Sequence, residues 1–400
     1  MSPWLRIFAP FAAGYYLSYL LRNVNAIIAP DLTREIGVSA SDLGLLTSAY
    51  LLAFGAFQLP LGLLLDRYGP RRVESALLVI AAVGSAAFAF ATNLTELALS
   101  RSLIGLGVSS CLMASFKAFS LWFPPERQAS LNAAVMAAGG LGALTATTPI
   151  GWVLPLAGWR GVFAALAVCA LLTAAAIFST PEKRAEGQRE TIAAQLRGLA
   201  GIVRSRVFWR FAPQTTAVVG GFMAIQGLWA VPWLMNFNGQ SREGAAFHLL
   251  LTSGAMLAGF LAIATFATRL QRRGVRLEAV LKTGVGLGLI ASVAIVFGFG
   301  HTYLMWFCLG LVFSVSNLAY ALLCSHFPVR LAGRANTALN LATFAGAFGL
   351  QWGFGALVDR LFEAGMTSKD AYQWSYGLLL ALQLLSYAWF VLSGRAGSRA

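Results

Sequence analysis

Charged residues are scarce in this sequence. Asp, Glu, Lys and Arg together make up 11% of its 400 residues, while hydrophobic residues make up 58%. A soluble globular domain carries about 25% charged residues. The shortage of charge therefore excludes an ordinary soluble domain and indicates a membrane protein.

Cysteine and histidine are also rare, with four and three residues respectively. All four cysteines lie in apolar runs, so the sequence predicts no disulfide framework. The three histidines are far apart and lack the spacing of metal ligands. No nucleophile is paired with a base. We therefore expect no catalytic residues, no metal, no cofactor and no enzymatic activity.

Acidic residues are missing from the middle of the apolar runs. The sequence has 15 acidic and 29 basic residues. The acids nearest to apolar runs lie at their ends or in connectors: Asp66, Glu74, Glu96, Asp359 and Glu363. Three cations, in contrast, lie inside predicted helices: Arg22, Arg101 and Lys117. Charges at this depth are costly and usually functional, so the positive interior predicts a negatively charged substrate.

The net charge of +14 comes from arginines in short connectors rather than from one patch. It therefore reflects membrane topology, and we expect no nucleic-acid partner.

Apolar runs of about 20 residues are typical of membrane-spanning helices. The first run lacks a cleavable signal pattern, so we expect the N-terminus to be retained. We predict twelve spanning segments, near 5–29, 41–64, 74–92, 97–122, 129–155, 160–179, 208–236, 245–268, 278–299, 303–326, 335–358 and 373–393.

The arginine distribution also predicts the orientation, because cytoplasmic loops carry an excess of Lys and Arg. With the N-terminus inside, most arginine-rich connectors, the polar linker and the C-terminal tail fall on the cytoplasmic side. We therefore expect both termini to be cytoplasmic. The composition, rich in Ala, Gly, Leu and Arg, favours a bacterial inner membrane.

A polar linker at 181–207 divides the chain. Four aliphatic residues recur there at helical spacing between arginines, which is typical of an amphipathic helix on the inner membrane surface. The sequence therefore predicts an N-terminal six-helix half at 1–180 and a C-terminal six-helix half at 208–400. Phe123 and Phe327 each precede a proline, and an asparagine follows nine residues after each. The two halves thus look related.

The connector between the second and third apolar runs carries a dense charged motif. Residues 62–72 follow the pattern Gly-x-x-x-Asp-Arg-x-Gly-x-Arg-Arg, which resembles the signature loop of the major facilitator superfamily. The resemblance implies an all-α membrane protein with two pseudo-symmetric halves that rock around a midplane site. It also implies that this loop holds the cytoplasmic side closed. The gating residues that it indicates are Gly62, Asp66, Arg67, Gly69, Arg71 and Arg72.

Arg22 is the predicted anchor for the substrate's charge, and Tyr15 and Tyr19 share its helix face. The run 14–22 is similar to helix one of the organophosphate/phosphate antiporters, in which the matching arginine binds the substrate phosphate. The nearest equivalent of their second arginine is Gln226, which argues against phosphate itself. The alternative is that Arg22 packs against carbonyl groups or extends towards the membrane surface.

Arg101 and Lys117 have different expected roles. Arg101 starts an Arg-x-x-x-Gly motif that looks like helix four of the superfamily, which implies a conformational role. Lys117 follows 16 residues later, about 160° away in direction if this helix is straight. Lys117 can then face the cavity as a second anchor, and extension to the inner surface is the alternative.

In the C-terminal half, aromatic and amide side chains share helix faces. Gln226 and Trp229 lie on the seventh predicted helix, Asn317 and Tyr320 on the tenth, and Gln351 on the eleventh. Such side chains suit an organic body rather than a bare inorganic ion. Ordinary packing is the alternative for each aromatic residue.

These observations predict a secondary active transporter of a small organic anion that works by alternating access. The expected partners are the substrate, membrane lipid, and either a coupling proton or a counter-substrate, with the chain acting as a monomer. Export of drugs or hydrophobic metabolites is the alternative, although the Gly-Pro pair of drug/proton antiporters is missing. A transporter-like sensor that binds without transport is a further alternative.

Overall fold

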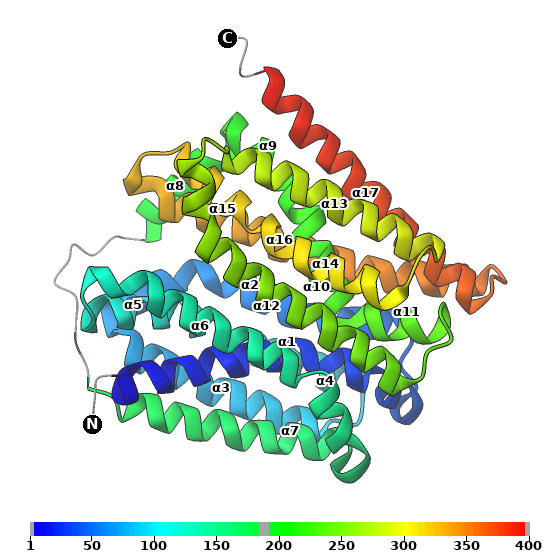
Figure 1. Cartoon of the computed structure of the whole chain (residues 1–400). Helices are drawn as coiled ribbons and strands as arrows, with labels where there is room; N and C mark the ends of the chain where they lie inside the picture. The colour runs from blue at the N-terminus through cyan, green and yellow to red at the C-terminus, as the bar shows by residue number, and fades with distance from the viewer. Residues whose placement is uncertain (1–3, 182, 184–191, 397–400) are drawn as a thin grey trace. The chain divides into compact units, whose positions relative to one another are not determined.

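The structure, a computed structural model, describes residues 4–181, 183 and 192–396, and within them every regular element is a helix (Figure 1). The chain forms two compact units. The first contains residues 1–38 and 49–192, and the second contains residues 39–48 and 193–400. Part of the predicted linker, residues 182 and 184–191, lies outside the described residues.

The first unit begins with a π-helical turn, η1, and continues with α-helices joined by short connections. Its elements are η1 (Trp4–Phe8), α1 (Ala9–Ile36), the part of α2 (Ala40–Tyr68) from residue 49 onward, α3 (Pro70–Phe90), α4 (Leu94–Val108), α5 (Cys111–Trp122), α6 (Pro125–Thr145) and α7 (Thr148–Phe178). Within this unit α3 lies beside α7 and α4, and α1 lies beside α6 (Figure 1).

Glycines allow the backbones of these helices to approach closely. A Cβ atom at Gly142 of α6 would overlap the carbonyl oxygen of Tyr16 in α1, and one at Gly107 of α4 would overlap the backbone nitrogen of Ala81 in α3. Small residues serve this purpose in membrane helices, where packing rather than water exclusion drives association. Gly142 thereby allows α6 to lie close against α1, the helix that carries Arg22.

The second unit contains the helices after the linker. They are α8 (Ile192–Val203), α9 (Arg206–Thr215), η2 (Thr216–Gly220), α10 (Gly221–Ala224), η3 (Ile225–Trp229), α11 (Ala230–Asn236), α12 (Arg242–Arg272), α13 (Leu277–Phe297), α14 (Thr302–Ser316), α15 (Leu318–Ser325), α16 (Val329–Glu363) and α17 (Ser368–Ala396). The elements from α9 to α11 follow one another directly, so 206–236 is one long helix interrupted by two π-helical turns.

Ten helices in the described part of the chain are long and apolar enough to cross a membrane, and Ser130–Thr145 is a shorter apolar helix. One of the ten, Leu94–Trp122, combines α4 and α5. The remaining predicted segment corresponds to α1, whose 28 residues extend about 42 Å but include Arg22. The all-helical membrane architecture is thus observed, and the count of twelve stays a prediction.

The first turns of α2 belong to the second unit, where they pack against α16. The carboxylate of Asp359 accepts hydrogen bonds from the backbone N–H groups of Ala40, at 3.2 Å, and Ser41, at 2.7 Å. The first N–H groups of a helix have no partner within the helix, and a carboxylate there also interacts favourably with the helix dipole. A Cβ atom at Gly355 would overlap the carbonyl oxygen of Ala40. Asp359 therefore caps α2 at a close crossing of the two helices.

We expect Asp359→Ala to lower the stability of the protein by about 1 kcal/mol, since substitutions that remove a helix cap cost this much. Thermal unfolding of the purified protein in detergent measures the change. Glu363→Ala is the matched control, because Glu363 is exposed near the end of the same helix. Equal melting temperatures for the two variants would contradict the capping role.

Candidate functional site

Arg22 lies half-buried on α1 and is enclosed by aromatic rings of the first unit. Its guanidinium carbon is 4.9 Å from the ring centre of Tyr19 and 4.9 Å from that of Phe54 in α2. Tyr15, one turn earlier on α1, packs edge-on against Tyr19 with ring centres 5.1 Å apart. Cations held over aromatic faces are stabilised electrostatically, so these rings restrict the orientation of the guanidinium group.

Arg101 supports the same stretch of α1 from α4. It is fully buried, and its Nη1 atom donates a hydrogen bond to the carbonyl oxygen of Leu21 at 2.8 Å. Its guanidinium carbon lies 4.8 Å from the ring centre of Tyr50, whose hydroxyl group donates to the carbonyl of Ser18 at 3.3 Å. The contact at Leu21 is directly before Arg22. Arg101 and Tyr50 therefore position the backbone that carries the candidate anchor.

Lys117 forms an ion pair with Asp66 of the charged loop motif. The straight helix assumed in the sequence analysis is not observed, because α4 ends at Val108 and α5 starts at Cys111. The angle calculated between Arg101 and Lys117 therefore does not apply. In this conformation the Lys117 ammonium group has the Asp66 carboxylate as its counter-charge.

The other residues of the loop motif lie at the junction of α2 and α3. Arg67 stacks over the ring of Tyr68, with 5.2 Å to its centre, and Arg71 over Phe178 of α7, with 4.6 Å. Gly69 has a φ of 82°, a conformation that favours glycine and lets α3 start at the next residue. Gly62 and Arg72 lie on α2 and α3 respectively. The six motif residues are thus gathered at one end of two consecutive helices.

Glu74 lies at the start of an apolar run in the sequence, and the structure shows that its side chain is buried within the first unit. Its side chain is 0% exposed on α3, one helical turn after Pro70. A Cβ atom at Gly14 of α1 would overlap its Oε1 atom. A carboxyl group near the end of a helix is thus enclosed by protein. Sequence position could not show this, because the groups that lie against the carboxyl group, Gly14 and Cys111, belong to other helices.

In the second unit, Gln226 and Trp229 lie on the π-helical turn η3. Gln226 donates a hydrogen bond from Nε2 to Oγ of Ser253 at 3.1 Å. Trp229 is fully buried, donates from Nε1 to the carbonyl oxygen of Gln351 at 3.0 Å, and stacks on Phe354 at 4.8 Å. Trp229 is thus packed against α16, while the amide group of Gln351 has no hydrogen-bond partner among the described residues.

Asn317 and Tyr320 lie half-buried where α14 ends and α15 starts. The hydroxyl group of Tyr320 donates to Oγ1 of Thr343 on α16 at 3.1 Å. The structure therefore connects Tyr320 to α16, as it does Trp229. Within the second unit, the predicted recognition residues come from η3, the α14–α15 junction and α16.

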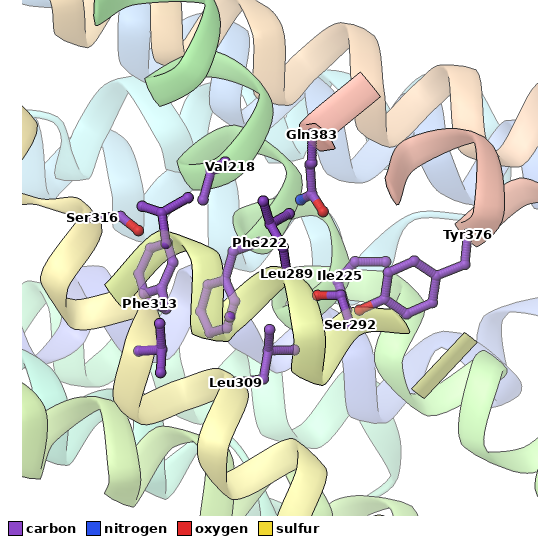
Figure 2. A pocket seen from close by; sticks show the side chains of 13 residues that line it. Val218, Phe222, Ile225, Leu289, Ser292, Leu309, Phe313, Ser316, Tyr376 and Gln383 are labelled. Atoms are coloured by element: carbon purple, nitrogen blue, oxygen red, sulfur yellow. The ribbon is translucent and has the colours of Figure 1, made fainter. Parts of the chain in front are cut away.

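A small cavity in the second unit is separate from these residues. It has a volume of about 30 Å³ and is lined mainly by apolar side chains around Phe222 and Phe313, with Ser292, Tyr376 and Gln383 as polar groups (Figure 2). This volume accommodates about one water molecule. None of the predicted substrate-binding residues lines it, and it is too small for an organic anion.

Curated relatives of the chain are named as transporters of organic anions. It is 27% identical to the hexuronate transporter of Escherichia coli K12 over 216 residues, half of each chain. It is 27% identical to a probable sulfoacetate transporter of Cupriavidus necator over 39% of this chain and 36% of that protein. The chain thus spans about a third to a half of the length of these relatives. A D-galactonate transporter of Escherichia coli is 23% identical over 83% of both chains.

Solved structures of transporters share the fold. The nucleoside transporter NupG matches with a TM-score of 0.77 at 14% identity, covering 97% of this chain and 99% of that one. A D-xylose-proton symporter matches with a TM-score of 0.74 at 16% identity, covering 96% and 97%. The family model of the Major Facilitator Superfamily matches residues 11–350. The chain therefore belongs to the Major Facilitator Superfamily.

Proposed function

We propose that this protein is a secondary active transporter of a small organic anion, with Arg22 as the charge anchor. The observation that carries the proposal is the guanidinium group of Arg22, held between the rings of Tyr19 and Phe54 in the first unit. Guanidinium groups bind carboxylates through two parallel hydrogen bonds. A substrate carboxylate or sulfonate is the matching ligand.

The relatives support this substrate class. Hexuronate, galactonate and sulfoacetate, the substrates in their names, are all organic acids that are ionised at neutral pH. Family membership and these transporter names point to a transport protein and not to an enzyme. They also favour the anion proposal over export of drugs or hydrophobic metabolites.

The finer features of the proposal follow from the sequence. They are twelve membrane-spanning helices, a bacterial inner membrane, cytoplasmic termini, a monomer and alternating access around a positively charged site. Arg22, Tyr15 and Tyr19 are proposed to bind the charged group. The residues proposed to recognise the organic body are Gln226, Trp229, Asn317, Tyr320 and Gln351. The loop motif and Arg101 are proposed to control the conformational cycle.

We expect Arg22→Ala to weaken binding of D-galacturonate about 10- to 100-fold, since a hydrogen bond to a charged group contributes about 1.5–3 kcal/mol. Ligand-induced thermal stabilisation of the purified protein in detergent measures the affinity. Arg22→Lys, which keeps the charge but loses the planar group, should give an intermediate affinity. Binding of a panel of sugar acids with unchanged affinity in Arg22→Ala would refute the anchor.

Lys117 offers a test that separates anchoring from gating. If its main partner is Asp66, Lys117→Ala and Asp66→Asn should change the rate of uptake in the same direction and leave the ligand affinity close to that of wild type. The pair is partly exposed, so each change should shift the conformational equilibrium by up to about 1 kcal/mol.

Uptake into proteoliposomes and thermal stabilisation are compared for both variants, with the exposed Lys369→Ala as the control. An affinity loss in Lys117→Ala as large as that in Arg22→Ala, with Asp66→Asn unaffected, would instead make Lys117 the second anchor.

A further inference from the structure

Glu74 is a buried carboxyl group to which the proposed function assigns no role. Its side chain is 0% exposed, and neither Oε1 nor Oε2 has a hydrogen-bond partner of standard geometry among the described residues. The thiol of Cys111 on α5, itself 0% exposed, is the side chain that interacts with it. An ionised carboxylate is very unfavourable in such surroundings, whereas the neutral acid is tolerated. This packing therefore accommodates the protonated form.

No cation in the described part of the first unit is placed to compensate a charge on Glu74. Charged side chains of the neighbouring helices make contacts elsewhere: Glu96 with Thr92, Arg101 with Leu21, Lys117 with Asp66, Arg160 with Glu35, and Arg22 with the rings of Tyr19 and Phe54. On α3 itself, Arg71 stacks over Phe178. From α1, Gly14 presents only its backbone to the carboxyl group. Protonation is therefore the available means of neutralising Glu74 in this conformation.

Cys111 lies between Glu74 and the part of the first unit that contains Arg22. The thiol interacts with Glu74 on one side, and the charge of Arg22 lies in its neighbourhood. A hydrogen bond also joins α5 to α1. The hydroxyl group of Ser115 on α5 donates to the carbonyl oxygen of Phe11 on α1 at 3.4 Å and to that of Cys111 at 2.5 Å. A change in the charge of Glu74 would therefore act on the helix that carries the anchor.

The position of Glu74 along α3 also suits proton exchange. It is the fourth residue after Pro70, where the helix starts, so it lies about 6 Å along the helix axis from that end. The loop motif with Asp66 and Arg67 directly precedes this end. A rearrangement of the loop would need to open only about one helical turn for water to reach the carboxyl group.

We propose that Glu74 is the proton-binding residue of a proton-coupled transport cycle. In one step a proton from water binds the carboxylate to give the carboxylic acid, and in the reverse step the same proton returns to water, with no other bond changed. The inference rests on the proposed transport function. It assigns the coupling ion, a proton, and the residue that carries it.

The first test uses D-galacturonate as the probe in proteoliposomes. With one proton per substrate, an inward pH gradient of one unit should drive about tenfold accumulation by wild type, because one pH unit is a tenfold ratio of proton activity. Glu74→Gln mimics the protonated acid permanently. It should keep exchange of D-galacturonate without a gradient and lose the gradient-driven accumulation.

The exposed Glu363→Gln is the matched control and should accumulate substrate as wild type does. Gradient-driven accumulation by Glu74→Gln, or exchange by wild type with no response to the gradient, would overturn the proposal. A structural role alone would lower exchange and accumulation together.

A second measurement does not depend on the substrate. Infrared spectra of purified wild type at neutral pH should contain a band of a protonated carboxyl group that is absent from Glu74→Gln. Cys111→Ala keeps Glu74 but removes the thiol beside it, so it should shift this band. This variant provides the test if Glu74→Gln does not fold. A failure to exchange any sugar acid would refute the proposed function. A spectrum without the band, or one unchanged by both substitutions, would refute the protonated Glu74.

Discussion

The hydrogen bond from Arg101 to the carbonyl oxygen of Leu21 is the contact on which the candidate site depends. Water is scarce inside a membrane protein, so a buried polar group that has no hydrogen-bond partner within the fold is costly. Arg101 uses a backbone carbonyl and the face of Tyr50. The charge that is costly to bury thereby holds α4, α2 and α1 together at the residue before Arg22.

The same constraint separates the three interior cations into different classes. Arg101 is fully buried and fixed to the backbone, Lys117 is paired with a partly exposed carboxylate, and Arg22 is half-buried among aromatic rings. Aromatic faces restrict the orientation of a guanidinium group, because the ring lies against the plane of the group. The role of Arg22 as the charge anchor stays a proposal.

The sequence predicted the family and the helical membrane architecture, because a charged motif between two long apolar runs is a local pattern. Residues 62–72 could be read without knowing any distant contact, and the family match confirms that interpretation. The sequence also indicated Arg101 as a conformational residue, through the Arg-x-x-x-Gly pattern, and its placement beside α1 agrees with that hypothesis. Its role remains a prediction.

Features that depend on helix crossings could not be predicted. Nothing in the run 97–122 indicates that the helix breaks at Ser109 and Ser110, since serines inside an apolar run are compatible with a helix. The pairing of Lys117 with Asp66 joins residues 51 positions apart. The burial of Glu74 depends on Gly14 in another helix. The π-helical turns η2 and η3 change the angular spacing along 206–236, so faces calculated for an ideal α-helix shift there.

The cap on α2 constrains the amino-acid sequence of its two helices unequally. Asp359 contributes a side chain, whereas Ala40 and Ser41 contribute only backbone N–H groups. The side chains at 40 and 41 can therefore vary with little effect on the hydrogen bonds, except for proline, which has no N–H group. Position 359 has no such freedom, because a carboxylate of the right length has to reach both donors. The cap therefore requires one particular side chain on α16 and almost no particular side chain on α2.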